Sequence, residues 1–163
     1  MPDLRPATPV DHATITRLAH RIWPPTFDEI LSAEQIDYML ELMYAPAAIA
    51  AQVAAGHQFL LFESKEEAIG YVSYQLDYLP RTTKIHKLYL LPEHHGKGWG
   101  RYLIDAVAER ARAAGQQALR LDVNYQNPAA AMYLHLGFVE VARVDTDIGG
   151  GYLMEDFVME RRL

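Results

Sequence analysis

The alternation of strand and helix patterns in the second half of the chain is the feature that most constrains its fold. Apolar, branched and aromatic runs typical of strands are separated by amphipathic stretches typical of helices, and glycines stand where one pattern gives way to the next. The expected segments are a strand at residues 84–91, a helix at 100–114, a strand at 118–123, a helix at 128–136 and a strand at 138–141. This order predicts an α/β protein.

The first third of the chain is predominantly helical in pattern. The expected elements are a short strand at 4–7, a helix from Thr8 to about Trp23, a helix opened by the capping box Ser32–Gln35, and a helix from Pro46 to Gly56. Pro24 and Pro25 are expected to end the first helix, because proline lacks the backbone N–H that a helix interior needs.

Strand patterns flank this α/β segment on both sides. The expected elements are an antiparallel hairpin of 59–62 and 68–76, a loop at 77–83, and a last strand at 152–161 that follows the turn Gly149–Gly151. No repeat, charge block or linker divides the 163 residues, so we expect a single domain over residues 1–163.

Composition excludes several classes of protein. The absence of cysteine removes disulfides, thiolate metal sites and thiol-based acyl-enzyme chemistry. A net charge of −6 makes nucleic acid an unlikely partner and favours cationic molecules, amines among them. The chain has neither the apolar run of a membrane span nor a secretory signal at its start, so we expect a cytoplasmic protein. His94 and His95 are adjacent and lack the spacing of metal ligands, so we expect no metal site.

A glycine-rich turn links the strand at 84–91 to the helix that follows. Residues 95–101 read His-Gly-Lys-Gly-Trp-Gly-Arg, with glycine at every second position from 96 to 100. Glycines let a backbone approach a ligand closely, and the free N–H groups of a helix start attract anions. The turn therefore indicates a diphosphate site, although a turn that only needs positive φ would show the same glycines. It lacks the Gly-Lys-Ser/Thr of a Walker loop.

Two segments carry a resemblance to a known family. The strand and the turn at 95–100 resemble the acetyl-CoA signature Q/R-x-x-G-x-G/A of the GNAT N-acetyltransferases, with His95 in place of Gln or Arg. Residues 121–138 resemble the family's V-N-x-x-N … Y-x-x-x-G-F block. The resemblance implies a mixed central sheet of about seven strands flanked by helices, in which two parallel strands splay apart to form the acetyl-CoA cleft.

The resemblance also implies which residues bind acetyl-CoA. The strand backbone would pair with the pantetheine arm, the turn and helix start would hold the diphosphate, and two asparagines would position the pantetheine. These residues are Leu88, Tyr89, Leu90, His95, Gly96, Lys97, Gly98, Trp99, Gly100, Arg101, Asn124 and Asn127. Turn capping is the alternative role for these asparagines, more so for Asn124 than for Asn127.

Acetyl transfer to an amine needs a base for the amine and an acid for the departing thiolate. Tyr133 lies four residues before Gly137, where the resemblance implies the general acid. His86 is the candidate base, and a histidine held for structural reasons is its alternative. Glu155 or Asp156 is a candidate partner for the substrate ammonium, with a solvated acidic turn as the alternative. The aromatic residues of the first third are candidates for the acceptor pocket, with ordinary core as the alternative: Trp23, Phe27, Tyr38 and Tyr44.

The predicted function is transfer of an acetyl group from acetyl-CoA to a primary amine, directly in a ternary complex. The acceptor is a small amine, an amino acid or a protein amino group. The alternatives are a non-catalytic acyl-CoA sensor and an interaction module of the same fold. An edge strand of the last hairpin makes a homodimer plausible.

Overall fold

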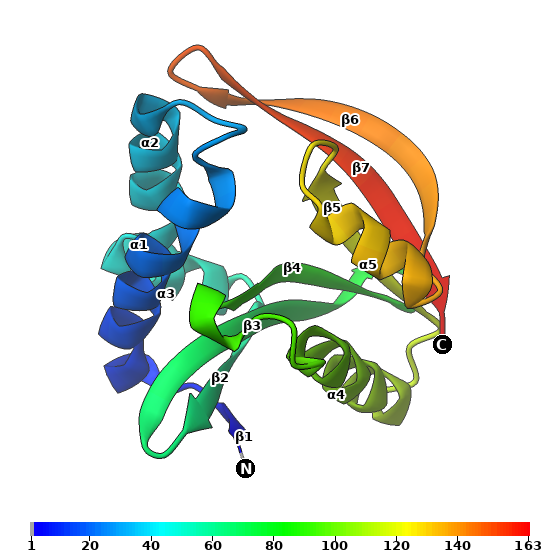
Figure 1. Ribbon diagram of the computed structural model, residues 1–163. Coiled ribbons are helices and arrows are strands. Elements are labelled where there is room, and N and C mark those ends of the chain that lie inside the picture. The colour runs from blue at the N-terminus through cyan, green and yellow to red at the C-terminus, as the bar shows by residue number, and fades with distance from the viewer. Residues whose placement is uncertain (1) are drawn as a thin grey trace.

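The computed structural model describes residues 2–163 and forms one continuous mixed sheet with helices on both faces (Figure 1). The elements are β1 (Asp3–Pro6), α1 (His12–Phe27), α2 (Ala33–Tyr44), α3 (Pro46–Ala54), β2 (Gln58–Ser64), β3 (Glu67–Leu79), β4 (Thr82–Leu90), α4 (Trp99–Ala113), β5 (Ala118–Asn124), α5 (Ala129–His135), β6 (Val139–Gly149) and β7 (Tyr152–Arg162). Short 3-10 turns at Pro9–Asp11 and Pro92–His94 precede α1 and follow β4.

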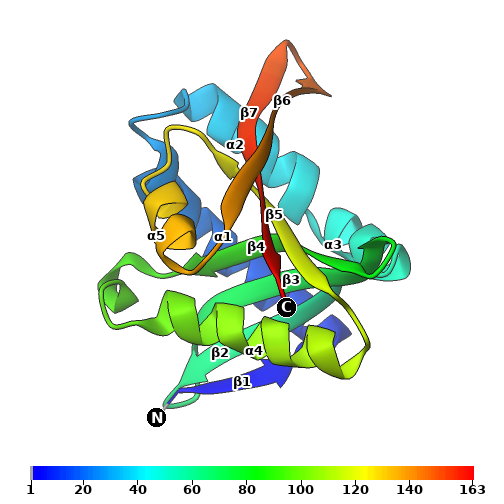
Figure 2. The ribbon, with the colours of Figure 1, turned by 90° about the vertical axis from the view of Figure 1, so that its right-hand side faces the viewer.

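Over the described residues, seven strands lie in the order β1-β2-β3-β4-β5-β7-β6. All neighbours are antiparallel except β4 and β5, which are parallel and are connected through α4. Helices α1, α2 and α3 lie on one side of the sheet, and α4 and α5 lie on the other (Figure 2). The expected mixed seven-strand sheet flanked by helices is confirmed.

The parallel pair separates partway along its length. Strands β4 and β5 pair only from Thr82↔Ala118 to Ile85↔Leu121. On its other side β4 stays paired with β3 as far as Leu90, and β5 stays paired with β7 as far as Asn124. Each strand therefore continues beyond Ile85 or Leu121 with one backbone edge facing a gap.

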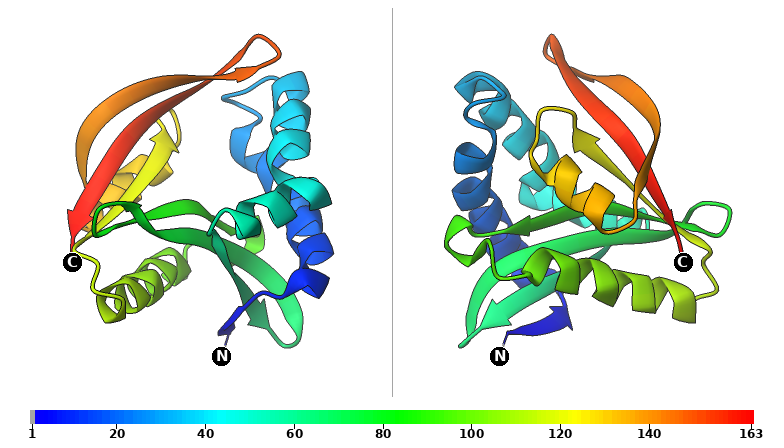
Figure 3. Two further views of the ribbon diagram at one scale, coloured as in Figure 1. Left: turned by 180° about the vertical axis from the view of Figure 1, so that it is seen from behind. Right: turned by 45° about the vertical axis from the view of Figure 1, so that its right-hand side comes forward.

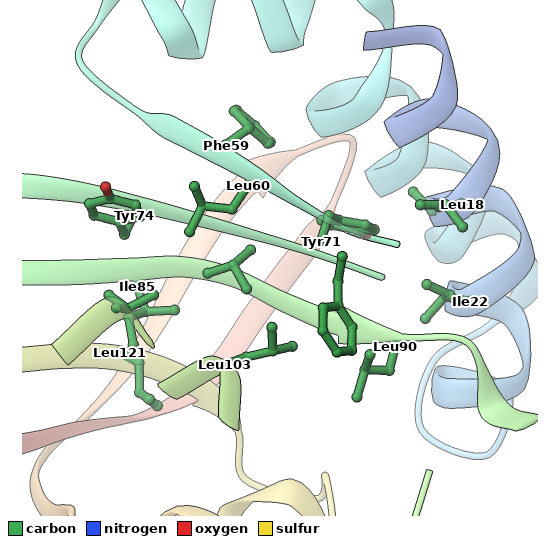
Figure 4. Close-up of a cluster of buried hydrophobic side chains, with 14 of the residues drawn as sticks. Leu18, Ile22, Phe59, Leu60, Tyr71, Tyr74, Ile85, Leu90, Leu103 and Leu121 are labelled. Atoms are coloured by element: carbon green, nitrogen blue, oxygen red, sulfur yellow. The ribbon is translucent and has the colours of Figure 1, made fainter. Parts of the chain in front are cut away.

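Buried side chains fill the space on both sides of the sheet. Leu18 and Ile22 of α1 approach it from one side, and Leu103 of α4 approaches Ile85 and Leu121 from the other (Figure 4). The aliphatic members of this core are almost completely enclosed, which provides the main driving force for folding. No helix within residues 2–163 combines the length and the apolar composition needed to cross a bilayer.

The expected end of the first helix is wrong: α1 runs through Pro24 and Pro25 to Phe27. The two prolines occupy its last turn, so the helix loses only two backbone donors. The Asp28 N–H still donates to the Pro24 carbonyl at 2.9 Å, and Trp23 and Phe27 are buried on the inner face. Packing of these two aromatic rings outweighs the local preference of proline.

The expected loop at 77–83 is also too long. Strand β3 continues to Leu79 and β4 begins at Thr82. The Gln116 side chain accepts a hydrogen bond from the Asp77 N–H at 2.9 Å and donates one to the Asp77 carboxylate at 2.8 Å. These two bonds, made by a residue 39 positions away, hold an irregular part of the hairpin that its own sequence does not encode.

Candidate active site

A cavity of about 920 Å³ opens where β4 and β5 separate. Its walls come from β4, β5, β7 and α5, its outer end from the glycine turn and the start of α4, and its inner end from α1 and α2. Segments from almost the whole length of the chain therefore meet at one space, with the unpaired edge of β4 along it.

The glycine turn forms the outer end of the cavity. Gly96 and Gly98 have φ values of +76° and +80°, and a Cβ added at either would meet open space. These two positions need glycine for backbone conformation and leave room for a ligand. Gly100 differs, because its Cβ would lie 2.9 Å from the Met132 sulfur of α5. It allows α4 and α5 to pack closely.

Helix α4 begins with unpaired amides beside the cavity. Gly98 is its N-cap and supplies no side chain, and the first helical bond runs from the Tyr102 N–H to the Gly98 carbonyl at 3.2 Å. The N–H groups of Trp99, Gly100 and Arg101 precede that bond, so none has a carbonyl one turn back. Three N–H donors at the positive end of a helix suit an anionic diphosphate.

The predicted coenzyme residues fall into two groups. Those that line the cavity are Leu88, Tyr89, Leu90, His95, Gly96, Gly98, Trp99, Gly100, Arg101, Asn124 and Asn127. Lys97 is exposed and lies outside the lining, so the structure does not bring it to the cavity. His95 has a specific partner, since its Nε2 lies 3.0 Å from the Leu90 carbonyl and ties the turn to the end of β4.

The two asparagines have structural partners as well. The Asn124 side-chain oxygen accepts from the Gln126 N–H, and that of Asn127 accepts from the Ala129 N–H at the start of α5, both at 2.9 Å. Each therefore caps a turn, as the structural alternative expected. Both also line the cavity, and a coenzyme contact for either stays a prediction.

Tyr133 lies on α5 against the cavity. Its ring packs edge-on against Phe138 at 5.7 Å between centroids, and its exposed fraction is 7%. Burial raises the pKa of its phenol to about 12, so the hydroxyl carries its proton throughout the physiological range. A protonated hydroxyl beside the cavity is the form that a general acid requires.

His86 occupies a β-bulge in β4. Ser73 pairs with Lys87 and Tyr74 pairs with Ile85, which leaves His86 as the extra residue. Its Nε2 lies 2.9 Å from the Gln75 side-chain oxygen.

The surroundings of His86 also weaken it as a base. Its ring stacks on His57 at 3.9 Å, and burial followed by the charges of His57 and the neighbouring lysines lowers its pKa to about 3. An imidazole with that pKa is neutral at pH 7 and holds an added proton weakly. The role of His86 as base stays a prediction.

The acidic residues near the chain end have different environments. Glu155 accepts a hydrogen bond from the Tyr125 hydroxyl and lies outside the cavity lining. Asp156 lines the cavity, is 7% exposed and lies opposite Asn124 in the β5–β7 ladder. Burial first, then the charge of Asp122, raises its pKa to about 6. Asp156 therefore lies in a buried strand and not in the solvated acidic turn that was its alternative, and its contact with a substrate ammonium stays a prediction.

Aromatic and thioether side chains form the inner end of the cavity. Trp23, Phe27 and Tyr44 line it and are also buried in the core, so their role as an acceptor pocket stays a prediction. Trp23 and Phe27 lie 4.7 Å apart between ring centroids. Met39 and Met43 of α2 complete this wall, and both also pack in the hydrophobic core.

Tyr38 has a different role from the other three aromatic residues. Its hydroxyl donates to the Ile148 carbonyl at 2.6 Å, and its ring packs on Tyr152 at 5.1 Å. These contacts fasten the tip of the β6–β7 hairpin to α2, and the view from behind shows the tip of the hairpin near this helix (Figure 3). The amide of Gln35 adds a hydrogen bond to the Leu153 carbonyl at 3.0 Å.

Comparison with curated proteins identifies relatives of known activity. The chain is 33% identical to the L-amino acid N-acyltransferase MnaT of Escherichia coli (strain K12) over 100 residues, which are 58% of this chain and 57% of the relative. It is 29% identical to aminoglycoside N(6')-acetyltransferase type 1 of Stenotrophomonas maltophilia over 151 residues, 88% of this chain and 90% of the relative. The chain spans little more than half the length of the first two curated relatives it matches.

Solved structures share the fold over the whole chain. The PaiA N-acetyltransferase of Thermoplasma acidophilum, in complex with coenzyme A, superposes with a TM-score of 0.82 at 24% identity and covers 100% of this chain and 99% of its own. A GCN5-related N-acetyltransferase of Rhodopseudomonas palustris gives a TM-score of 0.84 at 25% identity, with 100% and 96% covered.

The family model adds a match at the level of sequence. The model described as the acetyltransferase (GNAT) family covers residues 14–138, from α1 to the residue before β6, and includes the splayed strands, the glycine turn and Tyr133. The family predicted from the two sequence segments is therefore confirmed, and the chain belongs to the GNAT acetyltransferase family.

Proposed function

We propose that this protein transfers an acetyl group from acetyl-CoA to a primary amine, directly in a ternary complex. The observation that carries the proposal is the separation of β4 and β5 beside the first turn of α4, whose backbone amides are not capped by a side chain. A linear coenzyme with an anionic end fits a cavity that offers an unpaired strand edge along its length and helix amides at its mouth. A relative of the same fold is known in complex with coenzyme A.

The residues divide the binding task by chemistry. The amides of Trp99, Gly100 and Arg101 would hold the diphosphate, and the open edge of β4 at Leu88–Leu90 would pair with the pantetheine amides. The backbone provides most of these contacts, so the replacement of the usual Gln or Arg by His95 leaves the diphosphate cradle intact. A coenzyme contact for Lys97 stays a prediction, since its side chain points outside the lining.

Tyr133 is proposed as the general acid. When the amine nitrogen bonds to the thioester carbon and the carbon–sulfur bond breaks, the coenzyme leaves as a thiolate that needs a proton. The Tyr133 hydroxyl donates it, and its phenolate recovers a proton that the nitrogen loses as the amide forms. Because its pKa is about 12, the hydroxyl is fully protonated before the reaction.

The acceptor is proposed to enter from the side of α1 and α2, opposite the glycine turn. Relatives act on different amines, since one is named for L-amino acids and another for an aminoglycoside. A homodimer through the exposed edge strand β6 and a cytoplasmic location stay predictions.

The test combines binding and turnover in one preparation. Isothermal titration with acetyl-CoA is expected to show binding, and addition of amines, amino acids or peptides is expected to release coenzyme A thiol in an acceptor-dependent manner. Binding with no thiol release from any acceptor would favour the acyl-CoA sensor. Absence of acetyl-CoA binding would contradict the proposal and favour the interaction module.

A further inference from the structure

Asp156 is a buried carboxylate that lines the cavity and forms no ion pair with the residues the structure describes. It lies on β7 directly opposite Asn124, where β5 has already left β4, so it forms part of the wall at the splay. Two acidic residues line the cavity among residues 2–163, and the other, Asp122, is paired with the Lys84 ammonium at 3.0 Å. Of these two carboxylates, Asp156 is thus the one without an ion pair in the described part of the chain.

Burying a charged group without a cation is costly, so a carboxylate kept in such a place points to a ligand that supplies the cation. Asp156 of β7 and Tyr133 of α5 both line the cavity, and Tyr89 of β4 lines it as well. The proposed acid and the unpaired carboxylate therefore belong to the same cavity.

The opposite wall of this inner end is apolar. Trp23, Phe27, Met39 and Met43 line it, and they offer ring faces and thioethers rather than charges. Lys87 also lines the cavity, and its ammonium donates to the Gln52 side-chain oxygen at 2.8 Å. A molecule seated here would meet one carboxylate on one side and hydrophobic surface on the other.

We propose that Asp156 binds the ammonium of the acceptor and accepts its proton, and that the acceptor class is an amine with a single ammonium on an apolar body. This inference rests on the proposed acetyl transfer and names its substrate class. The ammonium gives one proton to the Asp156 carboxylate, and the free lone pair then attacks the thioester carbon. The nitrogen loses its second proton as the amide forms, Tyr133 protonates the thiolate, and Asp156 returns its proton to solvent.

The titration of Asp156 supports this role. Its pKa of about 6 leaves it ionised at neutral pH and makes it a stronger base than an exposed carboxylate. The charged groups that act on it are Asp122 on β5, Lys84 on β4 and Asp145 on β6. The buried phenols Tyr89 and Tyr133 titrate well above neutrality and stay neutral over the same pH range.

A carboxylate retained for catalysis leaves a signature in stability. The folded-state pKa of Asp156 is raised above the ordinary aspartate value of 3.8, so its contribution favours folding at low pH and is lost as the pH rises through about 6. At pH 7.5 the ionised group therefore opposes folding. Asp156→Asn is expected to raise the Tm by about 2 to 4 °C while activity falls. A merely structural carboxylate would show the opposite change in Tm.

The experiment compares wild type, Asp156→Asn and the control Glu140→Gln, which removes the same charge from an exposed position on β6. Phenethylamine serves as the apolar monoamine and spermidine as the polycation. Thiol release is expected to give phenethylamine a kcat/KM at least tenfold above that of spermidine. Asp156→Asn is expected to lower kcat/KM about 100-fold and to abolish the acidic limb near pH 6, with acetyl-CoA affinity unchanged. Glu140→Gln is expected to match wild type.

Binding of phenethylamine to the protein saturated with coenzyme A gives a readout without chemistry, and Asp156→Asn is expected to abolish it. The inference is overturned if Asp156→Asn keeps kcat/KM within threefold and still binds phenethylamine, or if spermidine is the better acceptor. Failure of wild type to bind acetyl-CoA would contradict the proposed function instead, and it is seen before any variant is compared.

Discussion

The two ends of the cavity are built in different ways. The outer end is a turn and a helix start, where Gly96 and Gly98 adopt positive φ and unpaired backbone amides are the proposed binding groups. The inner end consists of side chains of α1 and α2, and the walls beside it come from β5 and β7, so that positions as distant as Trp23 and Asp156 line one cavity. Backbone sites depend on a short local pattern, whereas side-chain sites depend on the whole tertiary structure. A backbone site for the coenzyme at one end is therefore compatible with many different side-chain pockets for the acceptor at the other.

Tyr133, which lies where the two ends meet, gives the largest expected effect. Tyr133→Phe removes the acid and keeps the ring against Phe138, so kcat is expected to fall about 100- to 1000-fold. The affinity for acetyl-CoA, measured by titration, is expected to stay within twofold. A kcat close to that of wild type would mean that water or another group protonates the thiolate.

Gly98 tests the outer end alone. Gly98→Asp places a carboxylate at the diphosphate site, and like-charge repulsion of a few kcal/mol predicts a loss of acetyl-CoA affinity of about 100-fold. The matched control is Gly115→Asp near the other end of α4, where φ is +77° and a Cβ also meets open space. Equal losses of affinity in the two variants would show that backbone strain, and not the diphosphate site, causes the effect.

Gly149 tests the inner end through the β6–β7 hairpin. A Cβ there would lie 2.6 Å from the Tyr38 hydroxyl, which would have to move and lose its bond to the Ile148 carbonyl. We expect Gly149→Ala to raise the KM for the amine about 3- to 10-fold, a loss of about 1 kcal/mol, and to leave acetyl-CoA affinity unchanged.

Gly151→Ala is the control for Gly149→Ala, with φ of +82° and no atom near the added Cβ. It carries the same backbone cost without the contact to Tyr38. If both variants raise the KM equally, the fastening of the hairpin to α2 does not shape the acceptor site.

His86 gives the smallest expected effect on activity. His86→Gln removes a ring with a pKa of about 3, so the acidic limb of kcat/KM near pH 6 is expected to persist. The lost stacking on His57 is expected to cost about 1 kcal/mol of unfolding free energy at pH 7.5.

The lowered pKa of His86 also fixes the sign of a pH effect on stability. Its contribution is present above pH 6.5, the value for a free histidine, and is lost as the pH falls towards 3. Urea unfolding of wild type and His86→Gln should therefore show a difference that shrinks as the pH is lowered. Loss of the acidic limb of activity in this variant would return the role of base to His86.

The contrast between the two ends explains what the sequence predicted and what it did not. The glycines of the turn and the register of Tyr133 before Gly137 are local patterns, and they located the outer end and the candidate acid. The path of α1 through Pro24 and Pro25 depends on the burial of Trp23 and Phe27, which no local rule encodes.

Side-chain environments were the least predictable part of the site. Two features weaken His86 as a base. Its bulge depends on the pairing of β4 with β3, and its stacking partner His57 is positioned by the end of α3. Glu155 and Asp156 are adjacent in the sequence, and only the ladder with β5 determines that Asp156 is the one at the cavity. Lys97 and Arg101 were both predicted to bind the diphosphate. Arg101 lines the cavity, whereas Lys97 is exposed and lies outside the lining.

The structure of the complex with acetyl-CoA is the most direct test of the central claim, that the separation of β4 and β5 forms the coenzyme site. The account predicts pantetheine along the unpaired edge of β4, the diphosphate at the amides of Trp99, Gly100 and Arg101, and the thioester between Tyr133 and Asp156. Coenzyme bound elsewhere, or closure of the two strands without it, would contradict the account.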